Sequence, residues 1–166
     1  MIILGIDPGT SILGYAVMKH VNNQHRALEY GVVSSGSDLS PPARLERIYS
    51  GLGRVIDQFK PDEAAVEQLF FNQNTRTALS VGEARGVAIL AAYQKGLPVF
   101  EYTPLQVKQA VAGYGRADKK QVQEMVRALL GLAAIPRPDD AADALAIALC
   151  HASSSRFLKM TGGDGR

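Results

Sequence analysis

The chain has 166 residues, 46% hydrophobic and 20% charged, a composition that suits one globular domain with a sizeable core and excludes disorder as the default. The formal net charge of +2 does not by itself indicate a polyanionic partner, and the single cysteine, Cys150, excludes an intrachain disulfide and favours a reducing compartment. Because we find neither a signal-peptide pattern nor an apolar run of ~20 residues, we expect a cytoplasmic protein with no membrane partner.

The first half of the chain predicts three strands, at residues 2–7, roughly 13–19 and roughly 26–35. A helix over 40–60 and a fourth strand over 64–67 follow them. The turn-like residues 22–24 separate the second and third strands, so we expect an antiparallel meander. The helix begins at Ser40-Pro41-Pro42, and its apolar residues recur three and four positions apart, which is the pattern of a helix with one buried face.

The second half predicts a helix from about Thr75 to Tyr93, a strand at 99–102, a short helix opened by Thr103-Pro104, a helix capped by Asp118 and Gln121, and a last helix from Asp139 to about Ala152. Strands first, with helices interleaved after them, indicate an α/β domain with a mixed sheet. We expect a single domain over residues 1–153 and a flexible C-terminal tail over 154–166.

Four carboxylates stand in apolar surroundings. Asp7 and Glu67 each end a buried strand, and Asp140 and Asp143 lie three residues apart on one face of an alanine-rich helix. Four converging carboxylates repel one another unless cations neutralise them. Oxygen ligands without nitrogen or sulfur suit Mg²⁺ or Mn²⁺, and two such ions ~4 Å apart can activate a water and stabilise a leaving oxygen in phosphodiester cleavage.

Each acid also has a purely structural explanation. Asp7 precedes Pro-Gly and can serve as a turn former. Asp139 and Asp140 suit the first turn of a helix, where the helix dipole favours negative charge. Because the two are neighbours, Asp139 can share any role that Asp140 has in a metal site. Glu67 can pair with Arg76 or Arg85. The joint occurrence of the four acids favours the site over these separate explanations.

The basic residues between 103 and 127 form a second cluster: Lys108, Arg116, Lys119, Lys120 and Arg127. Their position around a glycine-containing loop suits contacts to a phosphate backbone. A solvated helix face with pairs such as Lys120 and Glu124 explains the same charges equally well. The aromatic pair Phe70-Phe71 follows Glu67, and one ring can stack on an unpaired base or pack under the next helix.

These motifs, taken together, resemble those of the RuvC-type Holliday junction resolvases, bacterial endonucleases with a ribonuclease H-like fold. The matching segments keep the family's order over nearly the whole chain: Ile-Leu-Gly-Ile-Asp-Pro-Gly-Thr (3–10), Glu-Gln-Leu-Phe (67–70), Gly-Glu-Ala-Arg-Gly (82–86), Thr-Pro-Leu-Gln-Val-Lys (103–108), Gly-Tyr-Gly-Arg-Ala-Asp-Lys-Lys-Gln-Val (113–122) and Asp-Ala-Ala-Asp-Ala-Leu-Ala (140–146). The resemblance implies a five-stranded mixed β-sheet flanked by α-helices.

The resemblance also implies residue roles. The catalytic, metal-binding carboxylates would be Asp7, Glu67, Asp140 and Asp143. The residues that contact DNA would be Phe70, Arg76, Lys108, Lys119 and Lys120. It implies Mg²⁺ as cofactor, with Mn²⁺ able to substitute and two ions in each active site. The implied reaction is paired, symmetric hydrolysis of a four-way DNA junction in recombination and repair, leaving 5′-phosphate and 3′-hydroxyl ends. The implied partners are a second copy of the chain and the RuvA–RuvB branch-migration complex.

Three other classes share part of the pattern. An actin-like ATPase or sugar kinase also opens with a strand and an Asp-x-Gly-Thr turn, but it needs a second domain for which 166 residues leave no room. Another ribonuclease H-like nuclease, acting for instance on RNA–DNA hybrids, shares the carboxylates but not obviously the Gly-Tyr-Gly-Arg-Ala-Asp-Lys segment. A non-catalytic DNA-binding module has no need of all four acids.

Overall fold

The computed structural model describes residues 1–9, 11–36, 38–69 and 75–161, with side chains left out at 75–77 and 156–161. In this part of the chain the strands and helices follow one another as β1 (Ile2–Asp7), β2 (Ile12–Val21), β3 (Gln24–Ser34), α1 (Pro41–Phe59), β4 (Glu63–Glu67), α2 (Thr75–Gln94), β5 (Val99–Tyr102), α3 (Pro104–Ala112), α4 (Lys119–Leu129) and α5 (Asp139–Thr161). Each element that the sequence predicts is present, with boundaries shifted by a few residues. The end of α5 is the largest difference.

The strands form a single sheet in the order β3-β2-β1-β4-β5. β1 pairs antiparallel with β2 and β2 with β3, whereas β4 pairs parallel with both β1 and β5. The expected meander and mixed five-stranded sheet are therefore confirmed. β1 and β4 are parallel neighbours, so their carboxyl ends point the same way. Asp7 and Glu67, which stand at these ends, therefore lie side by side at one end of the sheet.

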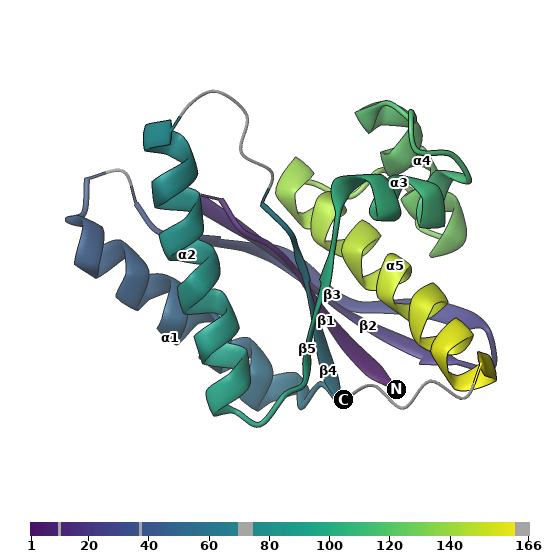
Figure 1. The fold of residues 1–166 in the computed structure, drawn as a ribbon, viewed down its shortest axis with the longest axis horizontal. Coiled ribbons are helices and arrows are strands. Elements are labelled where there is room, and N and C mark those ends of the chain that lie inside the picture. Colours follow the sequence, from purple (N-terminus) through teal and green to yellow (C-terminus); the bar gives the residue numbers. More distant parts are fainter. Residues whose placement is uncertain (10, 37, 70–74, 162–166) are drawn as a thin grey trace.

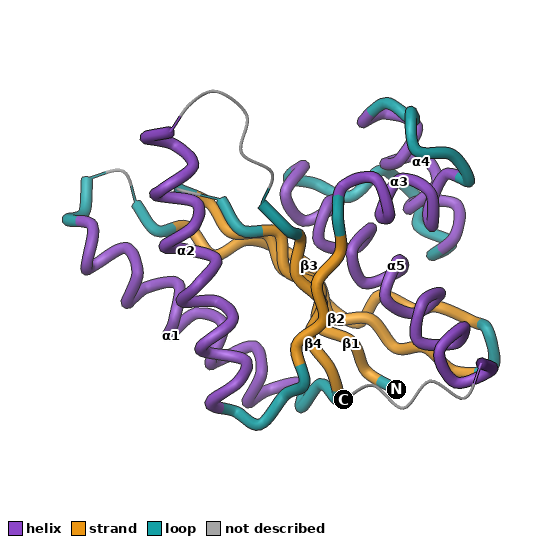
Figure 2. Tube along the Cα trace, in the orientation of Figure 1, coloured by secondary structure: helices purple, strands orange, loops and turns teal. Residues whose placement is uncertain are grey.

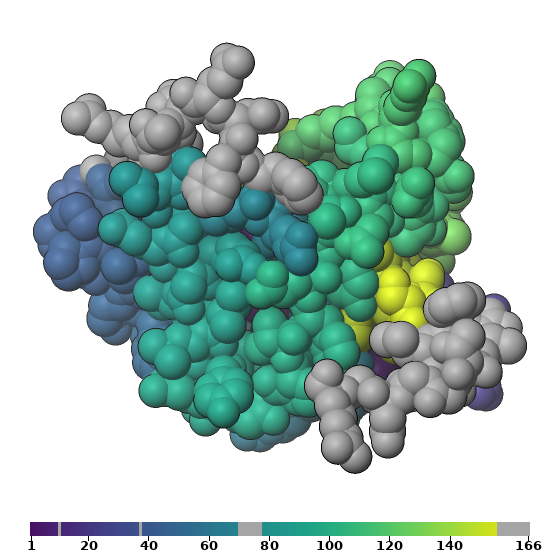
Figure 3. Space-filling view, in the orientation of Figure 1, coloured from purple at the N-terminus to yellow at the C-terminus, as the bar shows by residue number. Residues whose placement is uncertain are grey.

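Helices cover both faces of the sheet. Figure 1 and Figure 2 show α1 and α2 on one side and α3, α4 and α5 on the other. Each face has its own core: Leu4, Ile6 and Leu52 belong to the α1–α2 side, and Ile3, Leu145 and Ile147 to the α5 side. In the surface view, α3 and α4 cover much of α5 from this direction (Figure 3). No helix of the described residues is long and apolar enough to cross a membrane.

The helix ends follow the signals in the sequence. Asp118 and Gln121 form the expected capping box of α4, with each side chain bonded to the other residue's backbone N–H. Thr103 and Gln106 form a second capping box at the start of α3. At the end of α1, Lys60 adopts a left-handed conformation, with φ of 48°, and closes the helix.

The last helix is longer than the sequence predicts, since it ends at Thr161 rather than near Ala152. The physical reason lies in the serines that follow Ala152. The hydroxyls of Ser153 and Ser154 donate hydrogen bonds to the carbonyls of Leu149 and Cys150 one turn back, at 3.1 and 3.0 Å. The hydroxyls therefore find their hydrogen-bond acceptors within the helix, and the helix does not end at these serines. Residues 154–161 of the segment expected as a tail are thus helical, and its flexibility stays a prediction.

Candidate active site

Two glycines determine where the last helix lies on the sheet. A Cβ atom at Gly5 on β1 would stand 2.1 Å from the backbone oxygen of Ala144, and one at Gly14 on β2 would stand 2.1 Å from that of Asp140. Only residues without a side chain allow α5 to approach the strands so closely. Gly14 is the register partner of Asp7. The first turns of α5 are therefore held directly against the end of β1.

The acidic strand ends and α5 enclose a pocket of about 270 Å³. Asp7, Glu67 and Asp143 line it from three elements, together with the amines of Lys108 on α3 and Lys119 on α4. Its apolar wall consists of Pro104, Val107, Val122 and Ala146. The pocket thus brings together three of the four predicted carboxylates and two of the predicted lysines.

Asp7 is the most strongly perturbed acid of this pocket. Burial, together with the negative charges of Glu67, Asp143 and Asp140, raises its pKa from 3.8 to about 8, and the positive charge of Lys119 only partly opposes this. Asp140 does not line the pocket, but its charge acts on Asp7. Without a bound cation, Asp7 is therefore largely protonated at neutral pH.

The other two pocket acids are perturbed in the same direction. Burial and the charge of Asp143 raise the pKa of Glu67, against the opposing charges of Lys108 and Lys119. Burial also raises the pKa of Asp143, although Lys119 hydrogen-bonds to it. A group of carboxyls that all resist ionisation marks a site built to receive positive charge.

Lys119 on α4 contacts two acids of α5. Its Nζ lies 3.0 Å from Oδ2 of Asp143 and 3.5 Å from Oδ2 of Asp139. Partial burial works against its charge, but the hydrogen bond and the charge of Asp143 hold its pKa above the usual value. Asp139 also pairs with Arg137. Asp139 therefore forms ion pairs with two basic side chains.

The donor set of the pocket suits a hard divalent cation. Its three acids offer carboxylate oxygens, the type of ligand that Mg²⁺ prefers. A cation would also relieve the repulsion that raises the pKa of Asp7. As the side chains stand, no group of three or more acidic, histidine or cysteine residues in the described part of the chain is close enough to hold a metal ion. The residues of the pocket fit such an ion in kind and charge.

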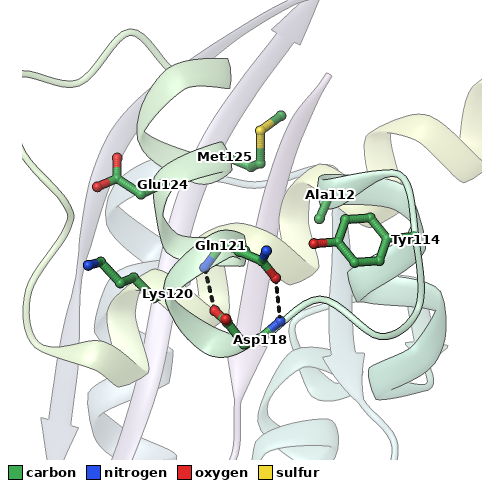
Figure 4. Close-up of a pocket in the computed structure, with 7 residues that line it drawn as sticks. All are labelled: Ala112, Tyr114, Asp118, Lys120, Gln121, Glu124 and Met125. Atoms are coloured by element: carbon green, nitrogen blue, oxygen red, sulfur yellow. Dashed lines mark hydrogen bonds between the residues drawn. The ribbon is translucent and has the colours of Figure 1, made fainter.

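The remaining predicted contacts fall in different places. Lys120 lines a neighbouring hollow rather than the acidic pocket, and Figure 4 shows it on the opposite side of that hollow from Tyr114. Arg76 belongs to α2, but its side chain lies outside the described residues, and so does Phe70 as a whole. Their DNA contacts stay predictions, as do the roles of the pocket residues.

Two contributions to the site were missed by the sequence reasoning. Arg85 was considered as a partner of the Glu67 carboxylate, but it donates to the Glu67 backbone carbonyl at 3.2 Å and pairs its guanidinium with Glu101 at 2.6 Å. The spacing role of Gly5 and Gly14 was also missed. A glycine inside a strand signals a close backbone approach, so this signal was present in the sequence.

Comparisons with known proteins show what the chain and its fold are similar to. A family model described as "Crossover junction endodeoxyribonuclease RuvC" matches residues 3–151. The proteins of that name from Rubrobacter xylanophilus and Desulfitobacterium hafniense are 57% and 58% identical to the chain, over 97% and 98% of its length and 90% and 99% of theirs. A solved structure of Thermus thermophilus RuvC in complex with Holliday junction substrate is 42% identical, with a TM-score of 0.90 over 95% of this chain and 96% of that one. The fold is thus ribonuclease H-like, as the sequence predicts.

Proposed function

The chain belongs to the RuvC family of crossover junction endodeoxyribonucleases, and from this premise we infer that it resolves Holliday junctions by hydrolysing phosphodiester bonds in recombination and repair. The observation that carries the inference is the pocket in which Asp7, Glu67 and Asp143 meet Lys108 and Lys119. Paired acids and amines in one small pocket suit a phosphodiester substrate, because the amines attract the phosphate while the acids supply oxygen ligands.

The lysines have the task of holding the DNA backbone. Lys108 on α3 and Lys119 on α4 line the same pocket as the acids. An amine within reach of a phosphate oxygen fixes the scissile group and offsets part of the negative charge that develops on it. We assign Lys120 and Arg76 to weaker contacts along the backbone, and Phe70 to a stacking contact near the junction centre.

We propose that Mg²⁺, or Mn²⁺ in its place, is held by Asp7, Glu67, Asp140 and Asp143, with two ions in each site. Ions bound there would supply the charge that activates a water and stabilises the leaving oxygen. The burial and mutual repulsion that raise the pKa of Asp7 support this assignment, since a cation lets the carboxyl ionise. The expected products carry 5′-phosphate and 3′-hydroxyl ends.

Exposed apolar side chains on α2 support a second copy of the chain as partner. Leu79 is 69% exposed, Leu90 47% and Tyr93 74%, and their spacing of 11 and 14 residues places them on one side of the helix. A homodimer that covers this row would carry two active sites, which suits paired nicks in a four-way junction. We further propose cooperation with a RuvA–RuvB complex, a location in the cytoplasm, and a single nuclease domain over residues 1–153.

The function is tested by cleavage of a synthetic four-way junction in Mg²⁺. The wild type should make symmetric nicks, and Asp7→Asn and Glu67→Gln should bind the junction but lose at least ~100-fold in rate, as expected when a group central to the chemistry is removed. Asp57→Asn, a surface acid paired with Lys95, serves as the matched control and should cut normally. Equal cutting by Asp7→Asn, or cutting of plain duplex as readily as junction, would refute the assignment.

A further inference from the structure

A pair of histidines lies at the other end of β2 from the acidic pocket. His20 and His25 are directly opposed in the register of the β2–β3 hairpin, close to its turn. His20 follows Gly14, the register partner of Asp7, by six residues on the same strand, which corresponds to about 20 Å of extended chain. The pair is therefore separate from the carboxylate site.

The two imidazoles face each other through the same type of nitrogen. Nδ1 of His20 lies 3.2 Å from Nδ1 of His25, while the ring centres are 4.8 Å apart. Because the nitrogens are closer than the centres, the rings converge at their Nδ1 edges. Two nitrogens bound to one Zn²⁺ at about 2.0–2.1 Å, with a tetrahedral angle between the bonds, stand about 3.3 Å apart. The pair already has the spacing of two ligands on one ion.

The protonation state also suits a metal ligand. Burial and the neighbouring His20 lower the pKa of His25, so this ring is neutral at pH 7. Without metal, one Nδ1–H can donate to the other Nδ1. When an ion binds, the donating ring takes its Nε2–H tautomer, so that both Nδ1 atoms offer a lone pair and no net proton is lost.

A cleft gives an ion access to the pair. It measures about 850 Å³ between the hairpin and the end of α4, and His25 lines it with the polar side chains of Asn23 and Gln24. This space admits the waters that would complete a coordination shell. The charged residues that line the cleft are Lys19 and Arg26, so it offers no carboxylate to Mg²⁺. Their positive charge lowers the affinity for any cation, and only ions with a strong preference for imidazole overcome it.

We propose that His20 and His25 form a two-histidine site for a divalent transition-metal ion of the Zn²⁺, Ni²⁺ and Cu²⁺ class. Bound there, the ion cross-links β2 and β3 next to their turn. The site differs from the acidic pocket in its donors, since it offers nitrogens where the pocket offers carboxylate oxygens. The two sites therefore select different metals, and Mg²⁺ does not compete for the histidines.

The test is calorimetric titration of Zn²⁺ into the full chain without a histidine tag, in excess Mg²⁺ to occupy the acidic pocket. We expect one Zn²⁺ site per chain, at least tenfold weaker in His20→Gln and in His25→Gln, and unchanged in Asp7→Asn. Loss of Zn²⁺ binding in Asp7→Asn alone, or equal binding by the wild type and both histidine variants, would overturn the proposal.

A second measurement needs no variant and so does not depend on how the substitutions affect folding. Electron paramagnetic resonance of the wild type with one equivalent of Cu²⁺ should show coupling to two imidazole nitrogens. Coupling to none or to a single imidazole would refute the two-histidine site. Thermal melting with and without Zn²⁺ should also show a stabilisation that disappears in each histidine variant.

Discussion

The two ends of β4 carry the same residue type in opposite circumstances. At its start, Glu63 accepts from a buried histidine: its Oε2 lies 2.6 Å from Nε2 of His151, whose Nδ1 lies 2.7 Å from the Tyr102 hydroxyl. The Phe100 ring packs on the same imidazole. At the end of the strand, Glu67 meets Asp7 and Asp143, and its pKa is raised by burial and by Asp143.

The difference separates stability from function. The Glu63–His151–Tyr102 network gives each buried polar group a partner, and such networks stabilise a fold. The acidic pocket gathers like charges in a partly buried place, which costs stability until a cation arrives. The same sheet therefore has a stabilising end and an end that carries the proposed active site, which we call the reactive end. Substitutions at the two ends should act in opposite directions.

The largest expected effect is a gain in stability when an acid of the reactive end is removed. Asp7→Asn should raise the free energy of unfolding in metal-free buffer at pH 8 by roughly 2–4 kcal/mol, because the folded-state pKa of about 8 stands well above the unfolded value of 3.8. The unfolded chain ionises this group first, so the wild type loses stability as the pH rises from about 4 to about 8.

Urea denaturation across this pH range, without and with Mg²⁺, measures the effect. The slope should flatten in Asp7→Asn and remain in Asp57→Asn. Mg²⁺ should stabilise the wild type more than Asp7→Asn. A wild-type slope that persists in Asp7→Asn would show that the repulsion lies elsewhere.

The next effect is a loss at the stabilising end. His151→Ala should lower the free energy of unfolding by about 3 kcal/mol, because it leaves Glu63 and Tyr102 without this partner and opens a cavity where the ring was 1% exposed. His25→Ala, at a partly buried site, should cost about 1 kcal/mol or less. Chemical denaturation of both variants measures the two losses in unfolding free energy. Equal losses would mean that the buried network contributes nothing of its own.

A smaller loss should follow when only one hydrogen bond of this network is removed. Tyr102→Phe deletes the hydroxyl next to His151 and should cost about 1 kcal/mol in unfolding free energy. Tyr114→Phe is the matched control, since Tyr114 is 47% exposed and should lose nothing measurable. If thermal or urea unfolding shows no difference between the two variants, the hydroxyl is not a structural partner of the imidazole.

The smallest effect on stability is expected at Lys119. Its ion pair with Asp143 is more than half exposed on the lysine side, so Lys119→Met should change the unfolding free energy by less than about 1 kcal/mol. Junction cleavage should nevertheless fall at least tenfold, because Lys119 lines the pocket that we propose to receive the phosphate. Lys60→Met, a surface change beside Asp57, should alter neither quantity. Normal cleavage by Lys119→Met would remove this lysine from the site.

The two ends also differ in how far the sequence predicts them. Asp7, Glu67 and the Asp-Ala-Ala-Asp run stand out because each acid interrupts an apolar element, and the caps of α3 and α4 rest on residues three apart. The Glu63–His151–Tyr102 network rests on residues 88 and 49 positions apart, with no local pattern to join them. Only the packing of α5 across the sheet brings them together. The end of α5 is not predictable from the local sequence either, since the hydroxyls of the serines after Ala152 can cap a helix or bond within it.

The contact of α5 with Gly5 and Gly14 has a consequence for how the family can vary. This contact acts as a spacer of constant thickness, because its closest atoms belong to the main chain of α5 and do not change when a side chain is exchanged. Substitutions elsewhere in the core can then raise or lower the stability of the domain without changing the distance between Asp7 and the acids of α5. Changes of sequence in the interior therefore leave the dimensions of the acidic pocket unaltered. A single added methyl group at Gly14 would push α5 away from β2 and change those dimensions.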